Sequence, residues 1–129
     1  MFKYAHRYIR QTINGDQWKK DFNNLFRLVS QRPYKGKMND KGEVLTPAGV
    51  MATVQIIEDL SAPAIDKETG EIMEDNSLEN VEVTIIGASY PLPLQKGDLV
   101  SLGNFIPELS YYVNYNLILR FDGIEKVEK

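Results

Sequence analysis

Alternating apolar and polar residues run through most of the chain from residue 25 onward. The segments with this alternation are rich in β-branched and aromatic residues and are bounded by Gly, Pro or Asp. That combination predicts β-strands with one face in a core. The expected strands lie near residues 25–34, 49–59, 80–87, 97–106 and 110–121. After an Asp122-Gly123 turn, IEKV (124–127) can rejoin the sheet.

A helical spacing comes before these strands. Five apolar residues recur every three or four positions, which predicts an amphipathic helix from residue 17 to about 29, with Asp16 as a candidate cap. The five are Trp18, Phe22, Leu25, Phe26 and Val29. The end of this segment, LFRLVSQRPY, can equally begin the first strand. The turn-rich segment KGKMNDKGE (35–43) predicts a hairpin loop.

One helix and four or five strands predict a mainly β fold. We expect a five-stranded antiparallel barrel with an N-terminal helix or arm. The basic arm or helix occupies residues 1–24, and the barrel domain occupies residues 25–129. Pro91 and Pro93 exclude a regular helix between the third and fourth strands.

Charge is divided unevenly along the chain. Residues 1–42 hold ten Lys or Arg and three Asp or Glu, a balance of +7, whereas residues 43–129 have a balance of −10. The basic part also holds seven of the aromatic residues. Cations interleaved with rings are typical of proteins that bind single-stranded nucleic acid. A helix face rich in Lys and Arg explains the same charge without a ligand.

The composition excludes several kinds of site. The chain has no cysteine, so it has no disulfide, thiolate metal site or cysteine nucleophile, which is compatible with a reducing cytoplasm. His6 is the only histidine, and the acidic residues lack the spacing of a calcium loop. We therefore expect no enzymatic activity, cofactor or metal. No apolar run approaches the roughly 18 residues of a membrane span, so we expect no membrane partner.

Four segments follow one another in an order that a known family shares. They are LFRLVSQRPYKGKMNDKGE leading into GVMATVQIIED, then NVEVTIIG, LQKGDLVSLGNFI and LRFDGIEKV. Together they resemble the first strand, hairpin and second strand, the third strand, the entry to strand four and the closing strand of the OB fold of single-stranded DNA-binding proteins. The resemblance begins at residue 25 and implies a barrel that binds single-stranded DNA.

The chain differs from the bacterial housekeeping members of that family. It ends in EKVEK instead of a Gly/Gln/Pro-rich tail, ASYPLPLQ replaces the helix between strands three and four, and residues 1–24 have no counterpart. In these respects it is more similar to the small, divergent members encoded by phages, conjugative plasmids and integrative elements.

The first candidate binding segment covers the first strand and the hairpin after it. Its residues are Arg27, Arg32, Tyr34, Lys35 and Lys37. In OB folds this hairpin closes over the bound strand, so a base can stack on Tyr34 while its neighbours meet phosphates. The alternative is an exposed hairpin rich in Lys and Gly for solubility.

The second candidate is the aromatic segment 110–121, which alternation divides into two faces. The face expected in the core holds Tyr111, Val113, Tyr115, Leu117, Leu119 and Phe121. The other holds Tyr112, Asn114, Asn116, Ile118 and Arg120. From this face Tyr112 and Arg120 are candidate contacts, and Phe105 is a further stacking candidate. Tyrosines packed against cross-strand neighbours are the alternative, and with inverted faces Tyr111 and Tyr115 become the stacking rings.

Two further segments complete the expectations. The N-terminal arm can extend the DNA path, pair with another subunit or simply fray; its candidate residues are Lys3, Tyr4, His6, Arg7, Tyr8 and Arg10. Six acidic residues between 61 and 80 would repel phosphate, so this loop is expected to be mobile and away from the ligand.

Sequence-tolerant binding of single-stranded DNA, in replication, recombination or conjugative transfer of a mobile element, is the leading functional hypothesis. RNA is a possible ligand of the same chemistry, and a homo-oligomer is possible. The alternative is a non-enzymatic protein-interaction or virion structural module on a small β-barrel.

Overall fold

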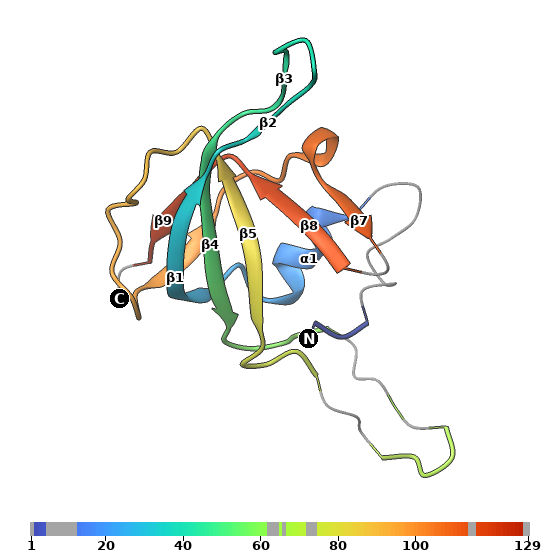
Figure 1. Cartoon of the computed structure of the whole chain (residues 1–129). Helices are drawn as coiled ribbons and strands as arrows, with labels where there is room; N and C mark the ends of the chain where they lie inside the picture. The colour runs from blue at the N-terminus through green and yellow to red at the C-terminus, as the bar shows by residue number, and fades with distance from the viewer. Residues whose placement is uncertain are drawn as a thin grey trace.

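The computed structural model describes residues 2–4, 13–61, 65, 67–71, 75–113 and 116–127. They form a mainly β fold with one short α-helix (Figure 1). In chain order the elements are α1 (Gly15–Asp21), β1 (Phe26–Tyr34), β2 (Lys37–Met38), β3 (Val44–Thr46), β4 (Gly49–Ile56), β5 (Asn80–Ile86), β6 (Leu99–Leu102), the 3₁₀-helix η2 (Pro107–Leu109), β7 (Tyr111–Val113), β8 (Asn116–Phe121) and β9 (Ile124–Lys126).

Seven of the strands form one mixed sheet in the order β7-β8-β5-β4-β1-β6-β9. Neighbouring strands pair antiparallel except β5 and β8, which pair parallel, so the expectation of purely antiparallel pairing is wrong. The strand order is linear, with β7 and β9 at its ends, and does not by itself describe a closed barrel. β2 and β3 form a separate hairpin that projects from the end of the sheet (Figure 1).

The segment after β6 also contacts the end of β8. Phe105 and Phe121 form an isolated antiparallel bridge. The Ile106 amide donates to the Arg120 carbonyl at 2.8 Å, and the Asp122 amide, directly after β8, donates to the Asn104 carbonyl at 3.0 Å. β8 is therefore hydrogen-bonded both to β5, its neighbour in the sheet, and to the segment that follows β6.

Four expected strands are confirmed as β1, β4, β5 and β6, each within a few residues of the expected bounds. IEKV rejoins the sheet as β9, which pairs with β6. A single strand over 110–121 is wrong, because β7 and β8 pair antiparallel with each other as a hairpin, Tyr112 opposite Leu117. The described residues 87–98 contain no helix, as the two prolines predict.

The helix is shorter than its apolar spacing predicts. Asn14, not Asp16, caps it, since the Asn14 side chain accepts a hydrogen bond from the Gln17 amide at 3.0 Å. Asn23 and Asn24 follow the helix with positive φ values, a conformation that asparagine tolerates better than most residues. The chain then enters β1, so the alternative start of the first strand is confirmed.

The core combines α1 with one face of the sheet. Trp18 of α1, Phe22 directly after α1 and Phe26 of β1 are fully buried, and the Trp18 and Phe26 rings stack with centroids 5.4 Å apart. Alternate residues of β4, including Val54 and Ile56, bury against them. These aromatic contacts join α1 to β1 within one core.

Candidate nucleic-acid interface

Two tyrosines and two cations meet where the β2–β3 hairpin joins the sheet. Tyr34 ends β1, Lys37 begins β2, Tyr111 begins β7, and Arg120 lies in β8. We call these four residues the cation–tyrosine cluster. Three of them are predicted site residues, which the fold brings together from segments up to 86 positions apart.

Arg120 is the buried member of the cluster, with a relative exposure of 2%. Its Nη2 donates to the Tyr34 hydroxyl at 3.1 Å, and its Nη1 donates to the Leu109 carbonyl at 2.8 Å. Its guanidinium carbon lies 5.3 Å from the Tyr34 ring centroid and 5.5 Å from that of Tyr111, both within cation–π range. Arg120 therefore connects β1 to the η2–β7 segment.

Lys37 is the exposed cation. Its Nζ donates to the Tyr111 hydroxyl at 3.1 Å and lies 5.3 Å from the Tyr111 ring centroid. This hydrogen bond, with the charges of Lys37 and Arg120, lowers the pKa of Tyr111 below its ordinary value, although partial burial opposes the shift. In the described part of the chain neither cation forms an ion pair with a carboxylate.

The facing expected for residues 110–121 is therefore wrong at several positions. Arg120 is buried instead of exposed, because η2 and the start of β7 fold over it. Tyr111 and Val113 are exposed, at 40% and 52%, because the hairpin turns β7 away from the core. Leu119 and Phe121 are buried as expected. Asn114 and Tyr115 lie outside the described residues.

Tyr112 and Lys35 stand beside the cluster without joining it. Tyr112 is 43% exposed and has no ring contact in the described part of the structure. Lys35 is also exposed, directly after β1, and forms no ion pair with a described residue. Both side chains are available to an incoming ligand.

Arg32 lies further along β1, on the exposed face. Its Nη2 is 3.3 Å from a Glu82 carboxylate oxygen and 2.8 Å from the Met51 sulfur. Both carboxylate and guanidinium are more than half exposed, so this ion pair contributes little stability and can exchange partners.

Arg27 and Phe105 do not belong to this site. Arg27 is exposed near the opposite end of β1. Seven residues of extended strand separate it from Tyr34, which corresponds to roughly 23 Å. Its Nη1 donates to the Gly97 carbonyl at 3.2 Å. The Phe105 ring packs on Phe121 with centroids 5.7 Å apart. It also covers Gly15, where a Cβ would overlap the ring. In this structure the Phe105 ring therefore packs within the fold, away from the cluster.

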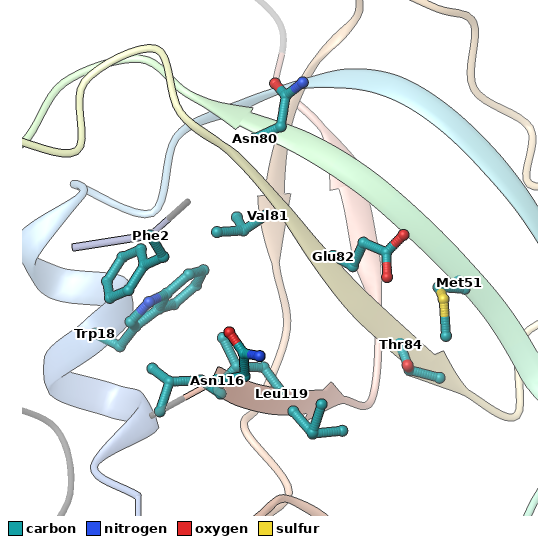
Figure 2. Close-up of a pocket in the computed structure, with 11 residues that line it drawn as sticks. Phe2, Trp18, Met51, Asn80, Val81, Glu82, Thr84, Asn116 and Leu119 are labelled. Atoms are coloured by element: carbon teal, nitrogen blue, oxygen red, sulfur yellow. The ribbon is translucent and has the colours of Figure 1, made fainter. Parts of the chain in front are cut away.

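A pocket that the sequence did not indicate lies where β5 and β8 diverge. Its volume is about 390 Å³, a size typical of small-ligand sites. Figure 2 shows Phe2 and Trp18 at one end and Met51 and Thr84 at the other. Glu82 lines it as well, so the Arg32 ion pair is at its edge. No single motif predicts this pocket, since its residues come from the N-terminal segment, α1, β4, β5 and β8.

The described acidic segment lies at the other end of the molecule. In Figure 1 the loop that contains residues 67–71 extends away from the β2–β3 hairpin. The N-terminal segment attaches near its base, where the Lys3 Nζ donates to Glu79 at 2.6 Å and lowers the pKa of that carboxyl. Asn76, which is buried, accepts from the Lys3 amide at 2.6 Å and donates to the Lys3 carbonyl at 2.9 Å. Of the remaining arm candidates, Tyr4 is described, and His6, Arg7, Tyr8 and Arg10 lie outside the described residues.

Among the described residues, no group of three or more His, Asp or Glu side chains is arranged to hold a metal ion. No described helix is long and apolar enough to cross a membrane. No family model matches the sequence, and no curated protein or solved structure is significantly similar to it.

Proposed function

We propose that this protein binds single-stranded DNA with little preference for sequence. The cation–tyrosine cluster is the observation that carries this proposal. In this cluster Lys37 and Arg120 lie against two tyrosine rings. In the described structure, all hydrogen-bond partners of the two cations are neutral. Cations that contact phosphates and rings that stack on bases are the two components of sequence-tolerant strand binding.

We further propose that the sheet is an OB-like barrel of five principal strands, β1, β4, β5, β6 and β8. The Phe105–Phe121 bridge and the hydrogen bond from the Ile106 amide to the Arg120 carbonyl support it, because they connect the segment after β6 to β8, which lies four strands away in the linear order. In an OB fold the loop between strands one and two and the loop between strands four and five bind the oligonucleotide. Here these loops are the β2–β3 hairpin and the η2–β7 segment, which meet at the cluster.

In this proposal the single-stranded DNA crosses the end of the molecule where the β2–β3 hairpin lies. Lys35 and Lys37 contact phosphates, Tyr112 stacks on a base, and Arg32 can exchange Glu82 for a phosphate oxygen. The outcome is protection of the strand and melting of its secondary structure, without a chemical step. Replication, recombination or conjugative transfer of a mobile element in the cytoplasm is the process that such an activity serves. A homo-oligomer would extend the path along the strand.

Fluorescence anisotropy tests this proposal directly. Labelled oligo-dT, oligo-U and duplex DNA are titrated at two salt concentrations. We expect oligo-dT to bind more tightly than duplex, and its affinity to fall steeply as salt rises. Comparable affinity for duplex would argue for a phosphate-only surface, and no binding to any oligonucleotide would refute the proposal. The oligo-U titration shows whether RNA is also a ligand.

One observation favours a second candidate, a protein-interaction or virion module. Met38, Val44 and Leu45 of the β2–β3 hairpin are 57–65% exposed. Met38 pairs with Val44 across the hairpin, and the register shift leaves Leu45 as the extra residue beside this pair, so three exposed apolar residues lie close together in the hairpin. A partner that covers this surface would bind with little salt dependence, in contrast to a nucleic-acid strand.

A further inference from the structure

Arg120 is a buried charge without a counter-charge in the described structure. Buried guanidinium groups are normally paired with carboxylates, because desolvation of an unpaired charge is costly. The partners of Arg120 are instead neutral: the Tyr34 hydroxyl, the Leu109 carbonyl and two tyrosine rings. Its Nε is also buried and has no hydrogen-bond partner. No carboxylate in the described structure therefore neutralises the positive charge that Arg120 brings to the cluster.

A second cation lies against the same ring. The Lys37 Nζ is 3.1 Å from the Tyr111 hydroxyl, and Lys37 and Arg120 both lie within 5.5 Å of the Tyr111 ring centroid. Two like charges around one neutral ring repel each other, and an anion bound between them would offset this repulsion. The lowered pKa of Tyr111 has the same physical origin, since the cluster favours a negative charge at that hydroxyl.

We infer that the cation–tyrosine cluster is a binding site for one phosphate group. The exposed Lys37 Nζ and the Tyr111 hydroxyl donate to phosphate oxygens at the surface. The buried Arg120 acts as a positioning residue. Its charge attracts the anion, and its hydrogen bonds to the Leu109 carbonyl and the Tyr34 hydroxyl fix the segments on either side of the site. Phosphate suits this arrangement better than a single carboxylate, because its oxygens can accept from several donors at once.

The source of the phosphate rests on the proposed function. For a DNA-binding protein it is an internal phosphodiester of the strand or a phosphate at the strand end. A free phosphate ion presents the same oxygens without the strand, so inorganic phosphate tests the site independently of DNA binding.

The first experiment measures the Tm of the full chain as inorganic phosphate replaces chloride at constant ionic strength. A ligand that binds only the folded state raises Tm. We expect a rise of about 2 °C or more for the unchanged protein, and a smaller rise for Lys37→Gln and Tyr111→Phe. Lys41→Gln is the matched control, because Lys41 is an exposed hairpin lysine outside the cluster. An equal phosphate response in Lys37→Gln and the unchanged protein, or an equal loss in Lys41→Gln, would overturn the inference.

The second experiment compares oligo-dT with and without a 5′-phosphate. We expect Lys37→Gln to weaken binding about tenfold to the oligonucleotide form that uses the site. Equal affinity of the unchanged protein for both forms assigns an internal phosphate, and a gain of fivefold or more with the 5′-phosphate assigns the strand end. If Lys37→Gln weakens neither form, the cluster does not bind strand phosphate. If no oligonucleotide binds but the phosphate response depends on Lys37, the proposed function fails while the anion site stands.

Discussion

The hydroxyl of Tyr111 has a perturbed pKa in the candidate interface. Lys37 donates to it, so the pKa of Tyr111 lies below the ordinary value of 10.0. We predict that one tyrosine ionises early in an ultraviolet absorbance titration of the folded protein. Tyr111→Phe should remove this early step, and Lys37→Gln should move it upward. Tyr112→Phe, the adjacent ring, is the control that leaves it in place.

The same shift determines how stability depends on pH. The folded state releases the Tyr111 proton at lower pH than the unfolded chain does. The free energy of unfolding, compared with Tyr111→Phe, should therefore rise as pH increases from the folded pKa of Tyr111 towards its unfolded value. Below the folded pKa the difference should stay constant. Identical pH profiles for the two proteins would contradict the hydrogen bond from Lys37.

Tyr112 provides the matching test of base stacking. Tyr112 is 43% exposed and has no contact with another ring in the described structure. Tyr112→Ala should weaken oligo-dT binding by about 1–3 kcal/mol. The free energy of unfolding should change by no more than about 0.5 kcal/mol, since no core contact is lost. If urea denaturation shows a large loss of stability while binding per folded molecule is unchanged, Tyr112 is a packing residue.

At the scale of the elements, α1 is held to the sheet by its aromatic side chains. Trp18 is fully buried and lies 5.2 Å from Phe22 and 5.4 Å from Phe26, measured between ring centroids. Trp18→Ala should lower the free energy of unfolding by about 3–5 kcal/mol, measured by urea denaturation. Leu60→Ala, at a residue that is 59% exposed, should have little effect. A small effect of Trp18→Ala would mean that α1 is not part of the cooperative core.

The strands were predictable where one face is buried and the other is not. In β4 the buried residues alternate with half-buried ones, and this pattern is visible in the sequence. The β7–β8 reversal was not predictable, because apolar residues continue every second position through Val113, Leu117 and Leu119 without a Gly or Pro. Alternation specifies which residues share a face but not where a strand turns back on its neighbour.

The same limit explains the site. Tyr34, Lys37 and Arg120 were candidates because cations and rings are typical of strand-binding surfaces. The burial of Arg120 depends on Leu109, eleven positions earlier, folding over it. Tyr111 was assigned to the core because a continuous strand would place it there. Local pattern therefore identified most of the chemistry, whereas the contacts between loops determined which residues meet.

At the scale of the whole molecule, the hairpin and the described acidic segment lie at opposite ends (Figure 1). Lys35→Gln at the hairpin end should make the plot of log affinity against log salt for oligo-dT shallower by about 0.7, the contribution of one phosphate contact in single strands. Lys96→Gln is the control, because Lys96 is an exposed lysine that belongs to neither the hairpin nor the cluster. Equal slopes for Lys35→Gln and the unchanged protein would mean that the bound DNA does not contact Lys35.

The acidic end gives the complementary prediction. Glu68 and Glu71 are exposed in the described part of the acidic segment. At about 0.1 M salt the screening length is about 10 Å, so charges at the far end of the molecule have little effect on a strand at the hairpin. The double change Glu68→Gln and Glu71→Gln should therefore leave the affinity for oligo-dT within about twofold of that of the unchanged protein. Any difference should be towards tighter binding and should grow as the salt concentration is lowered. Anisotropy titrations at two salt concentrations measure this. A loss of affinity, or a gain of tenfold or more at 0.1 M salt, would mean that the strand passes the acidic segment and that the binding face lies elsewhere on the molecule.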